Sequence, residues 1–110
     1  MISTIREAEG PLNRVIHHSE GFGTTVLCCP VCGNDYNHVQ RGYARIGTDN
    51  RENGTVAGLP VLEVGHGWRR SAVVIEFRCE GYEHLWRVVF QQHKGVEFCW
   101  YEIPEQEGEK

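Results

Sequence analysis

Several features that identify whole protein classes are missing from this sequence. Its 110 residues include 1 methionine, and no apolar run approaches the roughly 20 residues of a transmembrane helix. The start of the chain lacks the basic and then apolar layout of a secretory signal, so we predict a cytoplasmic protein without membrane contact. The His-Glu-x-x-His, phosphate-loop and Gly-x-Ser-x-Gly motifs of common enzymes are also missing. We therefore predict a protein without enzymatic activity.

Net positive charge is missing as well. The net charge is -4, and it is concentrated in an acidic tail, residues 102–110, where four glutamates stand against one lysine. The rest of the chain is nearly neutral and lacks the positive field that draws a protein to phosphate backbones. Nucleic-acid binding would need a local basic patch, so we expect a protein partner more than a nucleic acid.

What the sequence does contain indicates short strands joined by turns. It has 13 glycines, and apolar residues alternate with polar ones in several segments. Val73, Ile75 and Phe77, for example, fall on one face of an expected strand, and Glu76 and Arg78 fall on the other. Strands are predicted for residues 22–28, 36–46, 60–64, 71–79, 85–93 and 96–101.

We predict one mainly β, zinc-ribbon-like domain over residues 1–110, an antiparallel meander of five or six strands with little helix. Residues 1–21 show no clear periodicity and are expected to be irregular, with at most a helical turn. Residues 47–54 contain no apolar side chain, which indicates a mobile surface loop. Because so small a sheet gains from burial about as much as its ordering costs, a metal tie is physically favourable.

The strongest motif is Cys29-Pro30-Val31-Cys32-Gly33. Two cysteines at this spacing, followed by glycine, are typical of a metal-binding turn in which the backbone reverses and both sulfurs face one point. Cys79 and His84 supply a second pair later in the chain. We predict a structural Zn2+ site formed by Cys29, Cys32, Cys79 and His84.

The second pair is more widely spaced than the first, so Cys28 and His38 stay open as alternative fourth ligands. The 5 cysteines are an odd number, which with the predicted cytoplasmic location favours metal over disulfides. A thiol redox role is disfavoured because strand-like sequence, and not a helix, follows the first pair. Four protein ligands leave no position for a catalytic water. Cys99 has no partner at metal-binding spacing and is expected to be a packed side chain.

Three segments carry a resemblance to a known group of proteins. They are the Cys-Pro-Val-Cys-Gly turn, the sequence Ile-Glu-Phe-Arg-Cys-Glu-Gly that ends at Gly81, and Gln-His-Lys-Gly at residues 92–95 before an aromatic strand. Together they resemble small uncharacterised zinc-ribbon proteins of bacteriophages and bacterial mobile elements. Such proteins commonly have a second metal ligand close after the equivalent of Cys79, where this chain has Tyr82. The resemblance implies a fold and a setting, and it implies no activity.

Two functions follow from these features. In the first, a non-enzymatic, zinc-stabilised module of phage or mobile-element type docks on a host protein, for example to inhibit a bacterial defence system. In the alternative, the module binds single-stranded nucleic acid through Trp68, Arg69 and Arg70, with Arg87 as a further contact. Salt separates the two, because nucleic-acid binding weakens steeply as salt rises, whereas docking on a protein survives moderate salt.

Overall fold

The computed structural model describes residues 6–19, 24–47, 55–65, 71–93 and 95–104. Strands dominate these residues, and the helical structure among them is one short 3-10 helix. None of them forms a helix long and apolar enough to cross a membrane. In chain order the elements are β1 (Arg6–Pro11), η1 (Leu12–Val15), β2 (Ile16–Ser19), β3 (Thr24–Leu27), β4 (Asn37–Gly47), β5 (Thr55–Val56), β6 (Leu59–Gly65), β7 (Ala72–Cys79), β8 (Leu85–His93) and β9 (Val96–Pro104).

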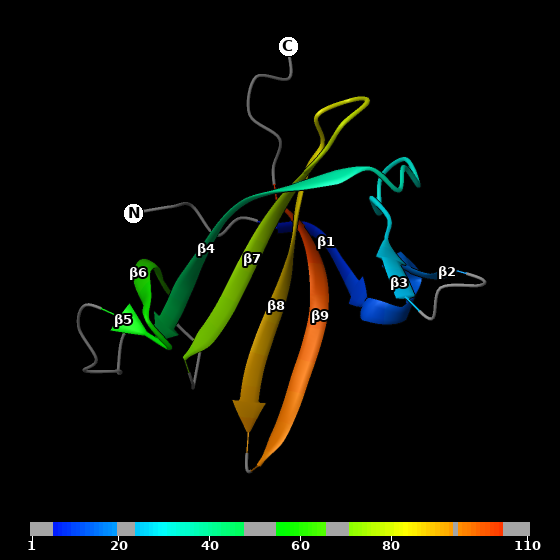
Figure 1. The fold of residues 1–110 in the computed structure, drawn as a ribbon. Helices are drawn as coiled ribbons and strands as arrows, with labels where there is room; N and C mark the ends of the chain where they lie inside the picture. Colours follow the sequence, from blue (N-terminus) through cyan, green and yellow to red (C-terminus); the bar gives the residue numbers. More distant parts are fainter. Residues whose placement is uncertain (1–5, 20–23, 48–54, 66–70, 94, 105–110) are drawn as a thin grey trace.

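Most strands join one sheet in the order β1-β9-β8-β7-β4-β6-β5, and β2 pairs with β3 in a separate hairpin (Figure 1). The mainly β class with little helix is thereby confirmed. The run β7, β8 and β9 is also an antiparallel meander of consecutive strands, as predicted. β-branched and aromatic residues fill these strands, and Gly95 takes a left-handed conformation (φ 81°) just before β9, where the chain has turned back from β8.

The prediction of a purely antiparallel sheet is wrong at β4. β4 pairs with β7 antiparallel on one side but with β6 parallel on the other. β5 and β6 are antiparallel to each other, so the chain reverses direction twice between β4 and β6 and returns along β4 in the same direction. Alternation along a strand predicts its two faces but not the direction of its neighbour, so the sequence carried no signal for this pairing.

The N-terminal segment also differs from the irregular structure expected for residues 1–21. β1 pairs antiparallel with β9 and forms an edge of the sheet, and η1 and β2 follow it. Gly10 lies directly on the ring of Tyr101, where an added Cβ would stand 2.7 Å from the ring atoms. The Tyr101 side chain can lie over β1 at this point because Gly10 has no side chain.

The larger hydrophobic cluster lies on one face of the sheet. Phe77 and Trp86 stack there with their ring centroids 4.8 Å apart. Val15 of η1 is a member of this cluster and Leu27 of β3 packs against it, so N-terminal elements contact this face. Two cysteines, Cys29 and Cys79, are also members, which places two of the four predicted metal ligands inside the core. The cluster comprises Val15, Cys29, Phe77, Cys79, Trp86, Val88 and Tyr101, with Leu12, Leu27, Ile75, Phe90 and Ile103 packed against it.

The opposite face buries charge. Arg45 donates from Nε to Glu63 (3.1 Å) and from Nη2 to Glu102 (2.8 Å). Arg87 donates from Nε to Glu102 (2.9 Å) and from Nη1 to Glu63 (3.2 Å). All four side chains are almost inaccessible to solvent. They form a closed ring of alternating charge, which we call the ion-pair ring.

Two aromatic residues extend the ion-pair ring. The Tyr43 hydroxyl accepts a hydrogen bond from Arg87 Nη1 (3.0 Å), and the Trp100 indole donates to Glu102 (2.9 Å). Burial raises the pKa of Tyr43 to about 12, although the charge of Arg87 opposes this shift, so its hydroxyl stays protonated. Tyr43 and Trp100 also belong to a smaller hydrophobic cluster on this face.

The ion-pair ring overturns two expectations. Arg87 was predicted to contact a partner, but its side chain is buried within the ring. Glu102 was assigned to the acidic tail, but it is a fully buried member of β9. The physical reason is the same for both, because an arginine or glutamate that alternates with apolar residues looks solvated in sequence unless its buried counterion is known. The rest of the tail, residues 105–110, and the predicted loop beyond Gly47, residues 48–54, lie outside the described residues.

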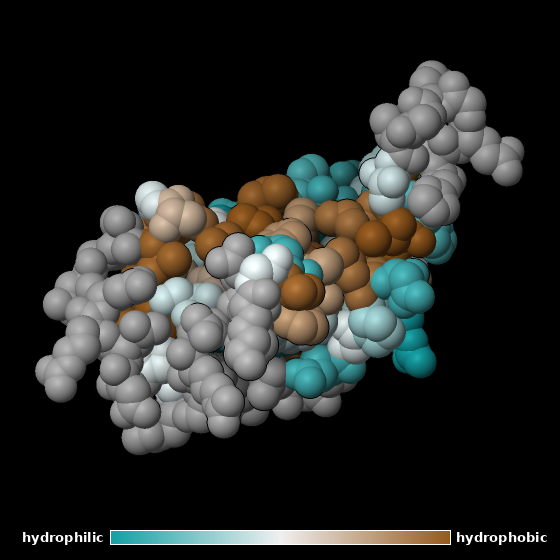
Figure 2. All heavy atoms as spheres, turned by 90° about the horizontal axis from the view of Figure 1, so that it is seen from below, coloured by the Kyte–Doolittle hydropathy of each residue, from teal (hydrophilic) through white to brown (hydrophobic). Residues whose placement is uncertain are grey.

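The sheet has two distinct ends. Cys79 ends β7 beside the start of β8, and we call this the metal end. At the other end β8 passes into β9, and the exposed Val96 and Phe98 lie on this hairpin. Figure 2 views the molecule from the hairpin end and shows hydrophobic residues in the middle of the described surface, with hydrophilic residues toward its margins.

Candidate metal centre

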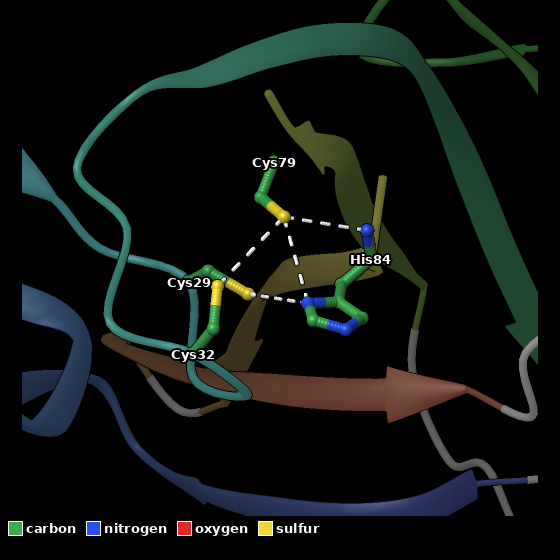
Figure 3. A group of neighbouring side chains, drawn as sticks. All are labelled: Cys29, Cys32, Cys79 and His84. Atoms are coloured by element: carbon green, nitrogen blue, oxygen red, sulfur yellow. Dashed lines mark hydrogen bonds between the residues drawn. The ribbon is translucent and has the colours of Figure 1, made fainter. Parts of the chain in front are cut away.

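Four side chains predicted as ligands meet at the metal end. One donor atom from each of Cys29, Cys32, Cys79 and His84 lies within 4.8 Å of every other (Figure 3). Cys29 and Cys32 come from the turn between β3 and β4, whereas Cys79 and His84 flank the turn between β7 and β8. Segments far apart in the chain therefore converge on one point, as the sequence predicted.

The first turn has the geometry of a metal-binding knuckle. The N–H of Gly33 donates to the carbonyl of Cys29 (2.8 Å), and the N–H of Cys29 donates to the carbonyl of Asn34 (2.8 Å). Gly33 takes a left-handed conformation with φ 81°, which glycine adopts without strain. The N–H of Val31 points at the Cys29 sulfur (3.4 Å), so the backbone stabilises a thiolate there.

The second turn repeats this backbone with different side chains. The N–H of Glu83 donates to the carbonyl of Cys79 (3.0 Å), and the N–H of Cys79 donates to the carbonyl of His84 (3.0 Å), at the same spacings as in the first turn. Cys79 thus corresponds to Cys29, and Tyr82 corresponds to Cys32. The second ligand is shifted by two residues to His84, which corresponds to Asn34. This shift explains why the second pair looks loosely spaced in sequence.

The distances fit a tetrahedral ion. Zn–S bonds of about 2.3 Å and Zn–N bonds of about 2.0 Å place two sulfurs about 3.8 Å apart and a sulfur and a nitrogen about 3.5 Å apart. Cys32 Sγ lies 3.9 Å from Cys79 Sγ. His84 Nδ1 lies 3.5 Å from Cys79 Sγ and 3.8 Å from Cys29 Sγ. These three separations differ by at most about 0.3 Å from the values for a Zn2+ ion, and the remaining pairs of donor atoms lie within 4.8 Å.

The protonation of the thiols is linked to the binding of a cation. Burial raises the pKa of Cys29 to about 11, so at neutral pH this thiol keeps its proton unless a cation replaces it. Burial also raises the pKa of Cys79, but hydrogen bonds from the backbone N–H groups of His84 and Tyr82 and from neighbouring thiols outweigh burial and lower it. A bound cation would offset the cost of holding several thiolates together.

The alternative ligands lie elsewhere. Cys28 is buried beside the site but is not a member of the group of four, and its N–H donates to the carbonyl of Val15 (2.7 Å). His38 pairs instead with the exposed carboxylate of Glu80 (3.0 Å). His84 is therefore the fourth member among the described residues. Cys99, expected to be packed, is exposed on β9.

Asn37 supports the site, and sequence analysis did not single it out. Its amide donates to the carbonyls of Leu27 and Asn34 (3.0 Å each) and accepts from the indole of Trp86 (3.0 Å). One side chain thus joins the end of β3, the first turn and β8. An asparagine at the start of a strand, where this residue type is depleted, was the available signal.

We expect Asn37→Ala to destabilise the protein by about 1–3 kcal/mol, because the buried Trp86 N–H loses its acceptor. The measurement is the free energy of unfolding in urea. Asn13→Ala, at an exposed position in η1, serves as the matched control and should change stability by less than about 0.5 kcal/mol. Equal effects of the two substitutions would contradict the supporting role of Asn37.

The structure describes no surface made of the predicted partner-binding residues. Trp68, Arg69 and Arg70 lie outside the described residues, and Arg87 is buried. Comparisons with protein-family profiles, curated proteins and solved structures find no match to this chain. The chemistry of the site must therefore be argued from its own geometry.

Proposed function

We propose that this protein is a non-enzymatic binding module whose fold is fixed by one structural Zn2+, held by Cys29, Cys32, Cys79 and His84. The observation that carries the proposal is the convergence of four suitable donor atoms within 4.8 Å of one another. Three sulfurs and one imidazole nitrogen form a donor set typical of structural zinc sites. Softer thiolate ligands favour Zn2+ over Mg2+ or Ca2+.

The closed donor set supports a structural role over a catalytic one. A catalytic zinc keeps a position for water or substrate, whereas four protein ligands complete the tetrahedron. Cys29 and Cys79 are also buried members of the main hydrophobic cluster. Zn2+ at this place would join the turn before β4 to the β7–β8 hairpin and thereby close one end of the core.

Docking on another protein is the function that we propose for the module. The net charge of -4 disfavours attraction to phosphate backbones. Exposed apolar and aromatic side chains at the metal end offer a surface for a protein instead. The resemblance to zinc ribbons of phages and mobile elements motivates the proposal that this partner is a host protein. Nucleic-acid binding would also need a local basic patch, whereas exposed carboxylates are the neighbours of these aromatic residues in the chain.

Metal analysis and cobalt substitution test the zinc site. We expect one Zn2+ per chain in untagged protein purified without chelator, and the visible absorption of tetrahedral, thiolate-bound Co2+ after exchange. His84→Ala should weaken metal binding and change the Co2+ spectrum, because water replaces an imidazole. His38→Ala is the matched control and should leave both unchanged, because His38 pairs with Glu80 instead.

Two outcomes would contradict the zinc assignment. One is native protein without stoichiometric metal. The other is a Co2+ spectrum that changes with His38→Ala and not with His84→Ala. A Co2+ spectrum typical of a five- or six-coordinate ion would instead contradict the structural role, because it would reveal bound water.

A further inference from the structure

The metal end exposes large apolar and aromatic side chains. Tyr36 is 67% exposed, Tyr82 is 72% exposed and Val31 is 47% exposed. Each comes from one of the two metal-binding turns or the residues that follow directly. Large exposed side chains that gather at one end of a protein, unlike single ones, mark a candidate interaction site.

The two turns hold these side chains in fixed positions. The N–H of Glu80 donates to the carbonyl of Tyr36 (2.8 Å), which ties the first turn to the second. The ring of Tyr82 stacks on the imidazole of His84, with centroids 5.7 Å apart and planes at 23°. The proposed Zn2+ would rigidify this arrangement, and a rigid surface loses less conformational entropy on binding.

Negative charge surrounds the exposed rings. Asp35 and Glu83 are exposed next to Tyr36 and Tyr82 in the chain, and Glu80 is exposed in the second turn, where it contacts His38. Arg78 is the one arginine or lysine among described residues 28–39 and 78–84. A Zn2+ bound by three thiolates would add one further negative charge. We call Val31, Asp35, Tyr36, Glu80, Tyr82 and Glu83 together the metal-end surface.

We propose that the metal-end surface binds a positively charged segment of another protein, rich in arginine or lysine with interspersed apolar residues. The faces of Tyr36 and Tyr82 would receive guanidinium or ammonium groups, which aromatic rings attract through their negative faces. The carboxylate of Glu83, and that of Glu80 beside its contact with His38, would pair with the same cations, and Val31 would contact their aliphatic stems. This inference rests on the proposed function, for which it names the surface and the partner chemistry.

Charge decides against single-stranded nucleic acid at this surface. Exposed tyrosines can stack on bases, but binding a strand also requires a positively charged groove along its phosphates. Here the carboxylates outnumber the cations and would repel a phosphate backbone. A cationic peptide satisfies both the rings and the charge.

Peptide binding to the full chain tests the proposal. The probe is a fluorescent 12-residue peptide of alternating arginine and leucine. A labelled glutamate–leucine peptide and a labelled 12-nucleotide oligothymidine, each titrated separately, are the negatively charged controls. We expect the arginine peptide alone to bind, with an affinity that falls as salt rises. Tyr36→Ala should weaken binding at least tenfold, as expected for a central aromatic contact. The zinc content of each variant is measured in parallel.

Matched variants show whether binding depends on the carboxylates of the metal-end surface or on the net negative charge of the whole protein. Glu80→Gln with Glu83→Gln removes two charges at the metal end, and Glu107→Gln with Glu109→Gln removes two from the tail. We expect the first pair to weaken binding at least tenfold and the second pair to change it less than twofold. Phe98→Ala, at the exposed hairpin end, should also change it less than twofold.

The outcomes distinguish the proposed metal-end surface from the proposed zinc site. Equal losses from the two glutamate pairs, no loss with Tyr36→Ala, or preferential binding of oligothymidine would overturn the metal-end surface as a site for cationic segments. If those results come from protein with one Zn2+ per chain, the structural zinc site stands. Protein without zinc that still binds the arginine peptide through Tyr36 would contradict the zinc site and support the surface.

Discussion

Replacing Cys79 by serine is expected to abolish the cooperative unfolding transition of the isolated protein. Cys79 is fully buried, and its sulfur lies 3.9 Å from Cys32 Sγ and 3.5 Å from His84 Nδ1. Structural zinc contributes about 10–16 kcal/mol in small zinc-binding peptides, whereas a whole domain is stable by about 5–15 kcal/mol. Loss of one thiolate ligand therefore removes a contribution as large as the total stability.

Thermal unfolding by circular dichroism, with zinc analysis of the same samples, gives the measurement. Cys28→Ser is the matched control for burial, because Cys28 is equally enclosed but is not a member of the donor group. It should lower stability by only about 1–2 kcal/mol and retain zinc. Cys99→Ser, at an exposed position, should have almost no effect. Similar losses for all three substitutions would show that the metal does not hold the fold together.

The contrast among these cysteines shows what the sequence could reveal about the site. The first turn was predictable because Gly33 directly follows the cysteine pair and adopts the left-handed conformation that the turn requires. The second turn uses Glu83 at the corresponding position, with φ 58°. A glutamate gives no signal for such a conformation, which is unfavourable for residues with a Cβ. The sequence therefore did not decide whether His84 is the fourth ligand. The structure places its Nδ1 beside the sulfurs of Cys29 and Cys79.

The sheet was predictable where apolar and polar residues alternate. Trp86 and Val88 lie in the main hydrophobic cluster, as their spacing in β8 indicated. Arg87 and Glu102 were not identified as buried, because their burial depends on Arg45 and Glu63 from distant strands. Periodicity assigns a residue to a face of one strand, and only the tertiary structure shows whether another layer or a counterion covers that face.

The candidate metal site and the ion-pair ring lie on opposite faces of the same sheet and would stabilise it in different ways. The proposed Zn2+ would add favourable free energy because its ligands are pre-assembled only in the folded chain. A buried ion pair contributes little net stability, because desolvation offsets the attraction, yet breaking it is costly. The ring therefore favours the particular pairing of β4 with β6 and of β8 with β9 that brings all four charges together.

Glu102→Gln is expected to destabilise the protein by about 3–5 kcal/mol, the usual cost of removing one partner from a buried ion pair. Glu102 accepts hydrogen bonds from Arg45, Arg87 and Trp100. Glutamine has nearly the same shape but no charge. Its amide nitrogen is a hydrogen-bond donor, and it would face the donor groups of Arg45, Arg87 and Trp100. Urea unfolding at pH 7 measures the loss. Glu97→Gln, at an exposed position of the same strand, is the control and should change stability by less than about 0.5 kcal/mol.

The effect of Glu102→Gln should also depend on pH. Burial raises the pKa of Glu102, but Arg45, Trp100 and Arg87 outweigh burial and lower the pKa from 4.5 to about 2. The folded state thus releases this proton more readily than the unfolded chain, so the stabilisation is fully present above pH 4.5 and is lost as the pH falls toward 2. The stability difference between wild type and variant should shrink over this interval. Taking the difference at each pH also cancels any contribution from acid release of the proposed Zn2+.

A second substitution identifies the origin of the loss. If Glu102→Gln acts by leaving a guanidinium without its counterion, removing that guanidinium should restore part of the stability. Arg45→Met combined with Glu102→Met leaves Arg87 and Glu63 as a balanced pair. We expect the double variant to be more stable than the sum of the two single losses predicts, by at least about 1 kcal/mol. Strict additivity would mean that Arg45 and Glu102 contribute through packing alone, and that the ring of charges does not act as a unit.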